Sequence, residues 1–370
     1  MKRYSFVHVT RHFIFACIGA FAFSVSWFLS SSAHARLLVL TDGRVLVTGA
    51  SVGADQAKIY DPVKNQWVQT TPANPAWTDS RSSGRFLALL PDGRVHVPGA
   101  GIYDPQSNTI DTTANQPDPF NSYSTTTILN DGRIMFIGGE SNTGEGLTDA
   151  AIFMTANNQW QNIHPMQQKR MLAAATTLQD NSVLVTGGIS AAGAGTELSA
   201  VELYTPDADQ WTQMAAMQTA RVRHTATLLD NGKVLIVGGE DGPTQALNTV
   251  ELYDPATQTW TQLPEMQEAR CDHYAVLLPD NQVMVAGGWT DDGLVDLVEI
   301  YDHAKNQWSR ADASWNWVSE AVPLPDGRLM VTRIIWSLEN GEWQNTQTIE
   351  IYDPQTKGFT VLASTETPMQ

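Results

Sequence analysis

Positive charge and cysteine are both scarce in this sequence. The 39 Asp and Glu residues outnumber the 22 Lys and Arg residues, which gives a formal net charge of -17. A chain with this surplus is repelled by nucleic acid phosphates and by anionic lipid surfaces, so no nucleic acid partner is expected. The two cysteines, Cys17 and Cys271, are too far apart in the sequence to form the close Cys pair of a zinc site.

Recognisable catalytic and metal-binding motifs are also missing. The sequence contains no H-E-x-x-H, no G-x-x-x-x-G-K-S/T and no G-x-S-x-G. Two acidic segments, Asp291–Asp296 and Glu240–Gly242, do not have the alternating carboxylates of a calcium loop and are expected to be solvated. We therefore expect neither a metal ion nor a cofactor.

The first 35 residues have the pattern of a signal peptide. Residues 2–11 carry three basic side chains, residues 13–29 are apolar, and Ala33-His34-Ala35 fits the small-x-small rule for cleavage. We predict cleavage after Ala35 and export to the periplasm or beyond, with no membrane attachment of the mature chain. An uncleaved membrane anchor is the alternative, because the apolar stretch approaches the length that spans a bilayer.

Cleavage at this position changes both the charge and the cysteine content. Residues 1–35 hold three basic and no acidic residues, so the formal charge of -17 becomes -20. Cys271 then remains as the single cysteine, which excludes an internal disulfide. The chain also has no Asn-x-Ser/Thr sequon. These features favour an exported bacterial protein.

The rest of the chain is built from a repeat, for which residues 221–260 serve as the type unit. Its first strand is expected from His224 to Leu229, and its second runs from Lys233 into Gly238-Gly239. Asn231-Gly232 between these apolar runs predicts a hairpin with a two-residue type I′ turn. A third strand with the order Val-Glu-Leu-Tyr ends at Tyr253, and a fourth contains Trp260.

Two spacings hold through seven copies of this unit. The turn pairs begin at Asp42, Asp92, Asp131, Asp180, Asn231, Asp280 and Asp326, and seven residues later come Gly49, Gly99, Gly138, Gly187, Gly238, Gly287 and Arg333. The third-strand aromatics are Tyr60, Tyr103, Phe153, Tyr204, Tyr253, Tyr301 and Tyr352, and seven residues later come Trp67, Ile110, Trp160, Trp211, Trp260, Trp308 and Phe359. We expect the repeat tryptophans to be core residues.

Gly-Gly after a strand, then Glu-x-Tyr-Asp-Pro, then Trp, at about 50 residues per copy, resembles the kelch repeat. This resemblance implies an all-β fold, a seven-bladed β-propeller of four-stranded antiparallel blades. The propeller would occupy residues 36–370, with blades at about 36–78, 79–116, 117–168, 169–219, 220–268, 269–312 and 313–370. Copies one, two and seven depart from the repeat and are interpreted as degenerate blades.

The two ends of the chain indicate how the ring closes. Many kelch propellers complete one blade with a strand from the other end of the chain. Here the last residues contain no copy of the first strand, so each blade is expected to be contiguous. Closure would then depend on packing between blades one and seven, and we expect a monomer.

Arginines recur at the start of the innermost strands. In kelch proteins that bind acidic peptides, arginines at matching positions line the pocket, so the resemblance nominates Arg170, Arg221 and Arg270 as ligand-binding residues. The adjacent side chains nominated with them are Arg223, His224 and His273. Guanidinium groups form bidentate bonds to carboxylates. The alternative is structural: a repeated Arg would tie one blade to the next, through the Glu that recurs in each third strand.

Several tryptophans are additional to the repeat. Trp289, Trp315 and Trp317 would form a glycan-binding patch if their aromatic faces are exposed. Loop tryptophans equally fill space between degenerate blades, and copy seven has lost its own repeat Trp. Both interpretations remain open.

Two enzyme classes share this fold. Galactose oxidase also carries its site on a kelch propeller, but the family's copper-binding tyrosines are missing here and only His273 matches its ligand set. Kelch sugar mutarotases of the bacterial periplasm are similar in size, and Arg223, His224, Asp272 and His273 are candidates for acid–base exchange. The favoured prediction is an exported, non-catalytic module that binds a protein, peptide or glycan at one face, with a mutarotase-like enzyme as the alternative.

Overall fold

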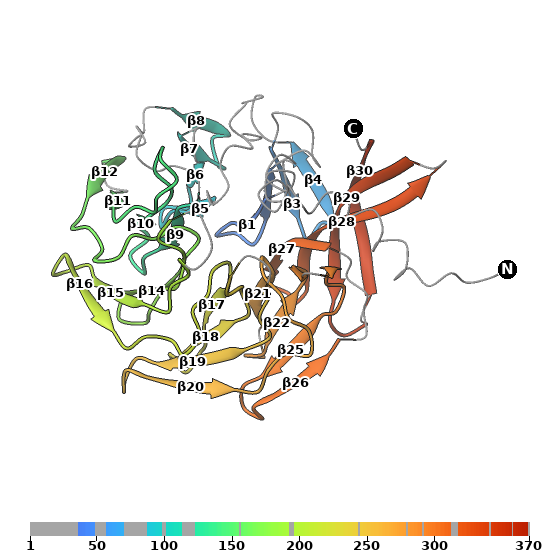
Figure 1. Cartoon of the computed structure of the whole chain (residues 1–370). Helices are drawn as coiled ribbons and strands as arrows, with labels where there is room; N and C mark the ends of the chain where they lie inside the picture. Colours follow the sequence, from blue (N-terminus) through green and yellow to red (C-terminus); the bar gives the residue numbers. More distant parts are fainter. Residues whose placement is uncertain are drawn as a thin grey trace.

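Seven four-stranded antiparallel sheets form a ring (Figure 1). The computed structural model describes residues 36–48, 57–69, 87–97, 101–112, 123–154, 157–191, 196–242, 245–278, 280–290, 292–311, 317–339, 342–356 and 358–368. The architecture is a β-propeller, as the repeat predicts. The proposed signal peptide, residues 1–35, lies outside the described residues. Within the described residues no helix is long and apolar enough to span a membrane.

The first four blades take their strands in chain order from the innermost outwards. Blade one has β1 (Arg36–Val39), β2 (Val45–Thr48), β3 (Ala57–Asp61) and β4 (Gln66–Gln69). Blade two has β5 (Ala88–Leu89), β6 (Val95–Val97), β7 (Gly101–Asp104) and β8 (Thr109–Asp111). Blade three has β9 (Thr125–Ile128), β10 (Ile134–Ile137), β11 (Ala150–Met154) and β12 (Gln159–Asn162). Blade four has β13 (Ala174–Thr177), β14 (Val183–Thr186), β15 (Val201–Thr205) and β16 (Gln210–Met214).

The last three blades follow the same order, with one added hairpin. Blade five has β17 (Thr225–Leu228), β18 (Val234–Val237), β19 (Val250–Asp254) and β20 (Thr259–Leu263). Blade six has β21 (Tyr274–Leu277), β22 (Val283–Ala286), β25 (Glu299–Asp302) and β26 (Gln307–Arg310), and its loop forms the hairpin of β23 (Trp289–Thr290) and β24 (Gly293–Leu294). Blade seven has β27 (Trp317–Pro323), β28 (Leu329–Glu339), β29 (Glu342–Asp353) and β30 (Gly358–Pro368).

The hairpin between the first two strands is present, but its turn is not the type I′ turn expected from Asn-Gly. Within the type unit only Gly232 of the pair has a positive φ, at 80°. The Gly232 N–H donates to the Leu229 carbonyl at 2.9 Å, and the Leu229 N–H donates to the Lys233 carbonyl at 2.8 Å. This is a type I turn followed by one left-handed residue, which the same dipeptide accommodates equally well.

Aromatic side chains join the two outer strands of a blade. In blade four, Tyr204 lies directly opposite Trp211, and their ring centres are 5.0 Å apart. Tyr204 is fully buried, whereas most of the repeat tryptophans are only partly buried, contrary to our expectation of core positions. The Trp211 Nε1–H donates to the His164 carbonyl at 2.7 Å, in the linker from the preceding blade. The repeat Trp therefore acts as an inter-blade contact.

The ring closes by packing and not by exchange of a strand. Each sheet is formed from one continuous segment of the chain, as expected. Residues of blades one and seven form a common apolar cluster that includes Leu37, Val47, Met330 and Ile351. The innermost strands β1 and β27 also lie next to each other at this seam.

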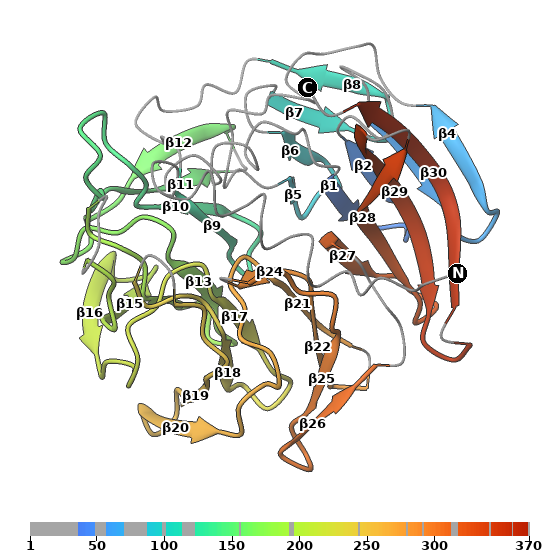
Figure 2. The ribbon, with the colours of Figure 1, turned by 45° about the vertical axis from the view of Figure 1, so that its right-hand side comes forward.

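Blade seven differs from the others in the length of its strands. β28, β29 and β30 have 11, 12 and 11 residues, compared with 4 or 5 residues for most strands of the other blades. Figure 2 shows these three strands extending along the side of the ring. β27 pairs with β28 only as far as Ile334, so the remainder of β28 pairs with β29 alone.

Candidate functional site

The two ends of the propeller are formed by different kinds of connecting segment. The Asp-Gly and Asp-Pro turns lie at one end, which we call the turn end. The loops that follow the second strands and the linkers that enter each new blade lie at the other end, which we call the loop end. Eight of the nine residues that the sequence nominates for ligand binding belong to segments at the loop end or beside it, and the ninth, Trp315, lies outside the described residues.

The three repeated arginines are buried at the loop end. Each guanidinium forms an ion pair with the Glu in the third strand of its own blade, and neither partner is more than 1% exposed. The pairs and their N–O distances are Arg170–Glu202 at 3.0 Å, Arg221–Glu251 at 2.7 Å and Arg270–Glu299 at 3.0 Å.

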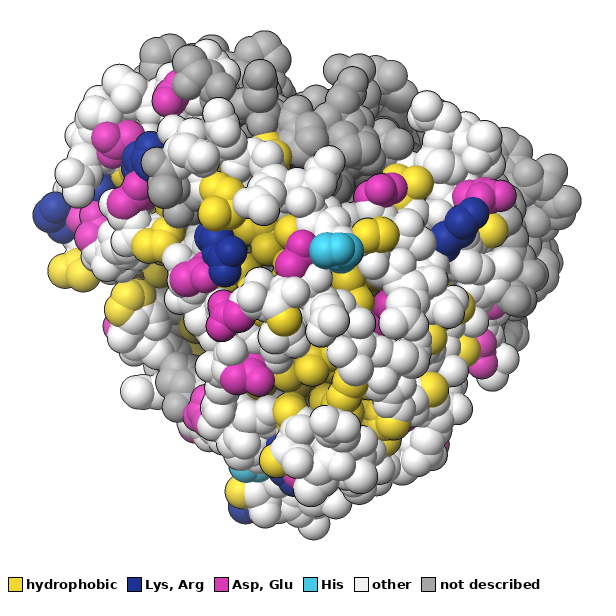
Figure 3. Space-filling view, turned by 90° about the vertical axis from the view of Figure 1, so that its left-hand side faces the viewer, with side chains coloured by type: hydrophobic (Ala, Val, Ile, Leu, Met, Phe, Trp, Pro, Cys, Tyr) yellow, Lys and Arg dark blue, Asp and Glu magenta, His cyan; other side chains and the backbone are white. Residues whose placement is uncertain are grey.

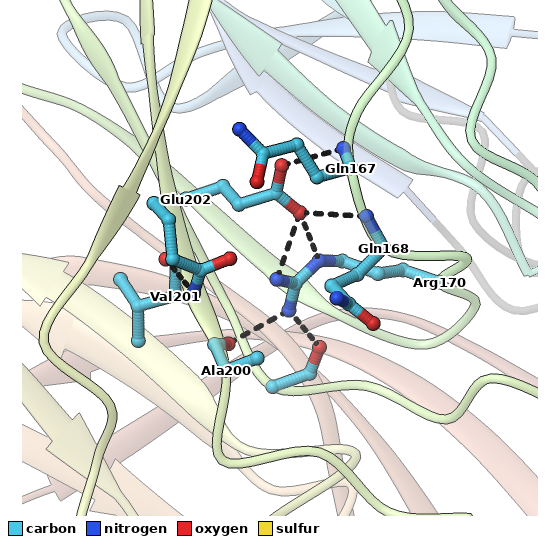
Figure 4. A network of polar contacts seen from close by, with 8 residues as sticks. Gln167, Gln168, Arg170, Ala200, Val201 and Glu202 are labelled. Carbon is cyan, nitrogen blue, oxygen red and sulfur yellow. Dashed lines mark hydrogen bonds and ion pairs between the residues drawn. The ribbon is translucent and has the colours of Figure 1, made fainter.

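Figure 4 shows this network in blade four. Nη1 of Arg170 donates to two main-chain carbonyls at 2.7 and 2.8 Å. Glu202 in turn accepts the N–H groups of Gln167 and Gln168 at 2.7 and 3.2 Å. The ion pair therefore anchors the linker that enters the blade to the middle of the same sheet.

These contacts correct the expectation that Arg170, Arg221 and Arg270 contact a ligand. A side chain that is fully enclosed and already bonded to a carboxylate has no donor to offer at the surface. The structural alternative describes these arginines better, with one change. Each pair joins a linker to its own blade and not one sheet to the next.

The two nominated histidines are buried as well. His224 is 7% exposed and His273 is 6% exposed, and each Nε2 lies 2.8–2.9 Å from a Thr hydroxyl of the preceding blade, Thr186 or Thr225 respectively. Burial lowers the pKa of His224 well below its ordinary value and that of His273 to about 3. Both imidazoles are therefore neutral inter-blade contacts, which corrects their nomination as ligand-binding residues.

A chain of main-chain hydrogen bonds runs around the loop end between neighbouring blades. Tyr123, Leu172, Arg223 and Asp272 occupy equivalent positions and have φ values of 66°, 56°, 57° and 49°. The N–H of each of the last three donates to the carbonyl of the residue before it in the series, at 3.0, 3.4 and 3.1 Å. The left-handed conformation costs a non-glycine residue about 1–2 kcal/mol, and such positions cluster at functional sites.

Two residues of this series, Arg223 and Asp272, belong to a polar cluster with Glu240 and Trp289. Nε of Arg223 lies 3.5 Å from Oε1 of Glu240, and Nη1 lies 3.5 Å from Oδ2 of Asp272. The guanidinium carbon is 5.9 Å from the centre of the Trp289 ring, within cation–π range. The Trp289 Nε1–H donates to Oδ2 of Asp272 at 3.2 Å. We call these four residues the rim cluster.

The rim cluster is partly accessible from solvent, mainly through Asp272, unlike the arginine pairs. The side chain of Asp272 is 46% exposed and that of Arg223 is 15% exposed. Burial lowers the pKa of Arg223, but the charges of Asp272 and Glu240 outweigh this effect and leave it above its ordinary value. Burial raises the pKa of Glu240, and the charge of Arg223 partly offsets the rise. The cluster thus presents a fixed cation between two carboxylates.

The sequence identified most of this cluster but not all of it. The sequence predicts Arg223 and Trp289 as ligand-binding residues and Asp272 as a candidate for acid–base exchange. The sequence predicts Glu240 only as a solvated loop residue, whereas its side chain is 12% exposed and faces Arg223. Of the other tryptophans, Trp315 lies outside the described residues. Trp317 begins β27, and its side chain is outside the described part.

Acidic side chains predominate around the rim cluster. Among the described Lys and Arg residues in the loops and linkers at the loop end of blades three to six, those outside the buried ion pairs are Lys169 and Arg223, and Arg310 ends strand β26 of blade six. The acidic side chains in the surrounding loops include Glu145, Asp149, Glu197, Asp241, Asp292 and Asp296. On the side of the molecule drawn in Figure 3, acidic side chains are spread over the surface and several lie beside basic ones. In the described part of the chain, no three His, Cys, Asp or Glu side chains are arranged to hold a metal ion.

Cys271 lies directly beneath the rim cluster. The thiol is fully buried, and its Sγ lies 3.6 Å from Oε2 of Glu240. Burial and the charges of Asp272 and Glu240 raise the thiol pKa, so the reactive thiolate is suppressed. We expect no reaction of residues 36–370 with Ellman's reagent over an hour at pH 8, and complete reaction in 6 M guanidinium chloride.

A second cysteine at an exposed site provides the control for this prediction. Asp207 is exposed at the turn end, and the variant Asp207→Cys should react within minutes while Cys271 stays protected. Rapid labelling of Cys271 in the folded wild-type protein would contradict the described packing around Glu240.

Comparison with known proteins gives one family and two relatives. Residues 100–322, more than half of the chain, match the family model described as the Attractin/LZTR1 beta-propeller. Kelch-like protein 23 from Homo sapiens is 26% identical over 113 residues, which cover 30% of this chain and 19% of that protein. Kelch-like protein 26 from Danio rerio is 30% identical over 122 residues, which cover 32% of this chain and 19% of that protein. The kelch assignment is confirmed, and the matched segments span about a fifth of either relative.

Proposed function

Because the chain belongs to the Attractin/LZTR1 beta-propeller family, we propose that it is an exported protein-interaction module whose contact surface is centred on the rim cluster. Kelch-type propellers generally bind proteins, which supports a protein or peptide partner. The observation that carries the choice of surface is the accessible cluster of Arg223, Glu240, Asp272 and Trp289 at the loop end.

The residue types of the rim cluster suit protein recognition. Trp and Arg are enriched among the residues that dominate binding energy at interfaces. Trp289 is placed on the small β23–β24 hairpin, and its indole is held by Asp272 and lies beside Arg223. A side chain whose rotamer is already fixed loses little conformational entropy when a partner binds. This preorganisation supports the rim cluster as the centre of the contact.

The charge around the cluster favours a partner segment with Lys or Arg side chains. Glu240 and Asp272 share one cation, so the cluster itself keeps a net negative charge, and the surrounding loops add further carboxylates. Complementary charge accelerates association and excludes partners of the same sign. We therefore expect basic peptides to bind at the loop end and acidic peptides not to bind.

Peptide binding tests this function directly. Fluorescent decapeptides rich in Lys, Arg and an aromatic residue, and matched peptides with Glu in place of the basic residues, would be titrated with residues 36–370 at 50 and 200 mM salt. The basic peptides should bind more weakly at high salt. Combined replacement by Asp272→Ala and Trp289→Ala should weaken binding about tenfold or more, equivalent to about 1.4 kcal/mol.

The matched control places two changes at the turn end. Asp207→Ser and Asp230→Ser remove the same number of side chains from exposed positions of blades four and five. These changes should leave peptide affinity unchanged. Equal loss in both double variants, or tighter binding of the acidic peptides, would refute the proposed surface.

Export is a separate part of the proposal. The basic, apolar and small-x-small segments of residues 1–35 support it. Expression of the full chain in a bacterium, followed by fractionation and mass determination, would detect a periplasmic or secreted product that begins at Arg36. A product of full length in the membrane fraction would favour the uncleaved anchor instead.

A further inference from the structure

A buried carboxylate lies at the seam where the propeller closes. Glu320 is on β27 of blade seven and is 9% exposed. Its Oε2 accepts the N–H of Leu37, on β1 of blade one, at 2.9 Å, across 283 residues of sequence. Figure 1 shows β1 and β27 next to each other at this junction. The side chain thus links the first and last innermost strands of the ring.

Glu320, on an innermost strand, differs in its partners from the buried glutamates on the third strands of blades four to six. Glu202, Glu251 and Glu299 each contact a buried Arg at 3.0 Å or less. Among the ion pairs of the described residues, none joins a cation directly to the Glu320 carboxylate, and the Arg36 guanidinium acts on it only as a nearby charge. An ionised carboxylate that is buried without a paired cation is strongly unfavourable. Burial accordingly raises the pKa of Glu320 to about 7, and the nearby charge of Arg36 only partly offsets the rise.

The predicted cleavage site is one residue from this carboxylate's partner. The main-chain nitrogen of Arg36 is joined to that of Leu37 through three covalent bonds, so the two nitrogens are no more than about 3.8 Å apart. The Arg36 N–H of the uncut strand points towards Thr48 on β2, opposite to the Leu37 N–H, whereas an α-ammonium group carries three hydrogens and can direct one of them towards Glu320. In the uncut chain the Arg36 nitrogen belongs to a neutral peptide group. Hydrolysis after Ala35 by the peptidase of the export pathway consumes one water. The hydroxyl goes to the Ala35 carbonyl, and Arg36 acquires a free α-amino group that is protonated at neutral pH.

We propose that cleavage after Ala35 creates an α-ammonium group at Arg36 that forms an ion pair with Glu320 and fastens blade one to blade seven. This inference rests on the proposed export and processing. Processing of the chain itself thus adds a second positive charge beside Glu320, next to the guanidinium of Arg36, whose charge only partly offsets the raised pKa of Glu320. The propeller therefore reaches its full stability only after its leader has been removed.

The surrounding charges define the pH range of this effect. The groups that face Glu320 are Arg36 on β1 and Tyr274 on β21, while Arg333 on β28 is already paired with Glu350. With a blocked N-terminus, protonated Glu320 is accommodated in the folded state without an unpaired buried charge. Because its pKa is raised, its contribution to the stability of the fold is complete below about pH 4.5 and is lost as the pH rises through about 7. A free α-ammonium group should reduce this loss until it deprotonates, above pH 8.

A double-mutant cycle tests the ion pair. Four proteins would be made: residues 36–370 with Arg36 as the first residue, the same chain with Gly-Ser-Ala before Arg36, and both chains with Glu320→Gln. At pH 7 the extension should lower the Tm by about 2–4 °C when Glu320 is present. In the Glu320→Gln background the extension should change the Tm by less than about 1 °C. An equal shift in both backgrounds, or no shift in either, would overturn the proposal.

A pH series on the two Glu320 proteins gives an independent result, even if Glu320→Gln does not fold. The difference in Tm between free and extended chains should be present at pH 7 and absent at pH 10, where the α-amino group is neutral. A difference that does not change with pH overturns the ion pair. N-terminal sequencing of the exported protein tests the processing step alone. Arg36 as the first residue supports the proposal, and any other first residue overturns it for the natural protein. The double-mutant cycle on the recombinant chains is interpretable in either case.

Discussion

Replacement of Arg221 by alanine is expected to lower the free energy of unfolding by about 3–5 kcal/mol, because Glu251 would remain as a buried charge without a partner. Nη2 of Arg221 lies 2.7 Å from Glu251, and Nη1 donates to the Gly238 carbonyl at 2.6 Å. The Glu251 carboxylate would lose its cation, and the Gly238 carbonyl would lose its hydrogen-bond donor. A typical domain has a total stability of about 5–15 kcal/mol, so this single change removes a large part of it. Urea unfolding followed by circular dichroism measures the loss.

Two further variants separate burial from charge in this experiment. Lys305→Ala removes an exposed cation that pairs with Asp302 and should cost less than about 1 kcal/mol. The double change Arg221→Met with Glu251→Leu removes both buried charges and should cost less than Arg221→Ala alone. If Arg221→Ala is no more destabilising than Lys305→Ala, the buried pair does not anchor the linker as described.

Gly187→Ala is the second change with a large expected effect, about 2–5 kcal/mol of destabilisation. Gly187 has a φ of 60°, and an added Cβ would lie 2.3 Å from the Arg221 carbonyl oxygen and 2.8 Å from Cε1 of His224, both in the next blade. The left-handed backbone costs alanine about 1–2 kcal/mol, and forced repacking adds about 1–3 kcal/mol. Thermal unfolding and yield of soluble protein would record the effect.

Gly242 provides the matched control, because it separates the steric clash expected at Gly187 from the strain of the left-handed backbone. Its φ is 98°, so alanine experiences backbone strain there as well, but nothing lies within 4 Å of the added Cβ. Gly242→Ala should therefore cost about 1–2 kcal/mol, from the backbone alone. Equal costs for the two variants would show that the close approach of neighbouring blades at Gly187 is not tight.

The architecture was predictable because each sequence repeat contains all four strands of one blade. The spacing from Tyr204 to Trp211 recurs because those two residues lie opposite each other on adjacent strands. The turn type was not predictable from Asn231-Gly232, since the dipeptide suits both a type I′ turn and a type I turn followed by a left-handed residue. Strand pairing follows from periodicity, whereas the exact turn depends on local hydrogen bonds.

The arginines show why repetition alone does not locate a binding site. Arg221 recurs beside a recurring Glu251, and a sequence does not reveal which of two long side chains is enclosed by its neighbours. The useful signal was variation at equivalent positions. The residue after the glycine pair is Glu140, Ile189, Glu240 or Trp289 in blades three to six. The two that form the rim cluster are Glu240 and Trp289, and we expect such variation at the proposed contact surface because a binding site is needed once, whereas the packing of a blade is needed in every copy.

Every sheet of this ring comes from one uninterrupted stretch of the chain. Duplication or loss of a gene segment that encodes one such stretch would add or remove a whole blade, and no strand would have to be threaded through another sheet. In this topology the number of blades is not tied to a strand that both ends of the chain share. A propeller that shares a strand between its two termini has to preserve both ends together.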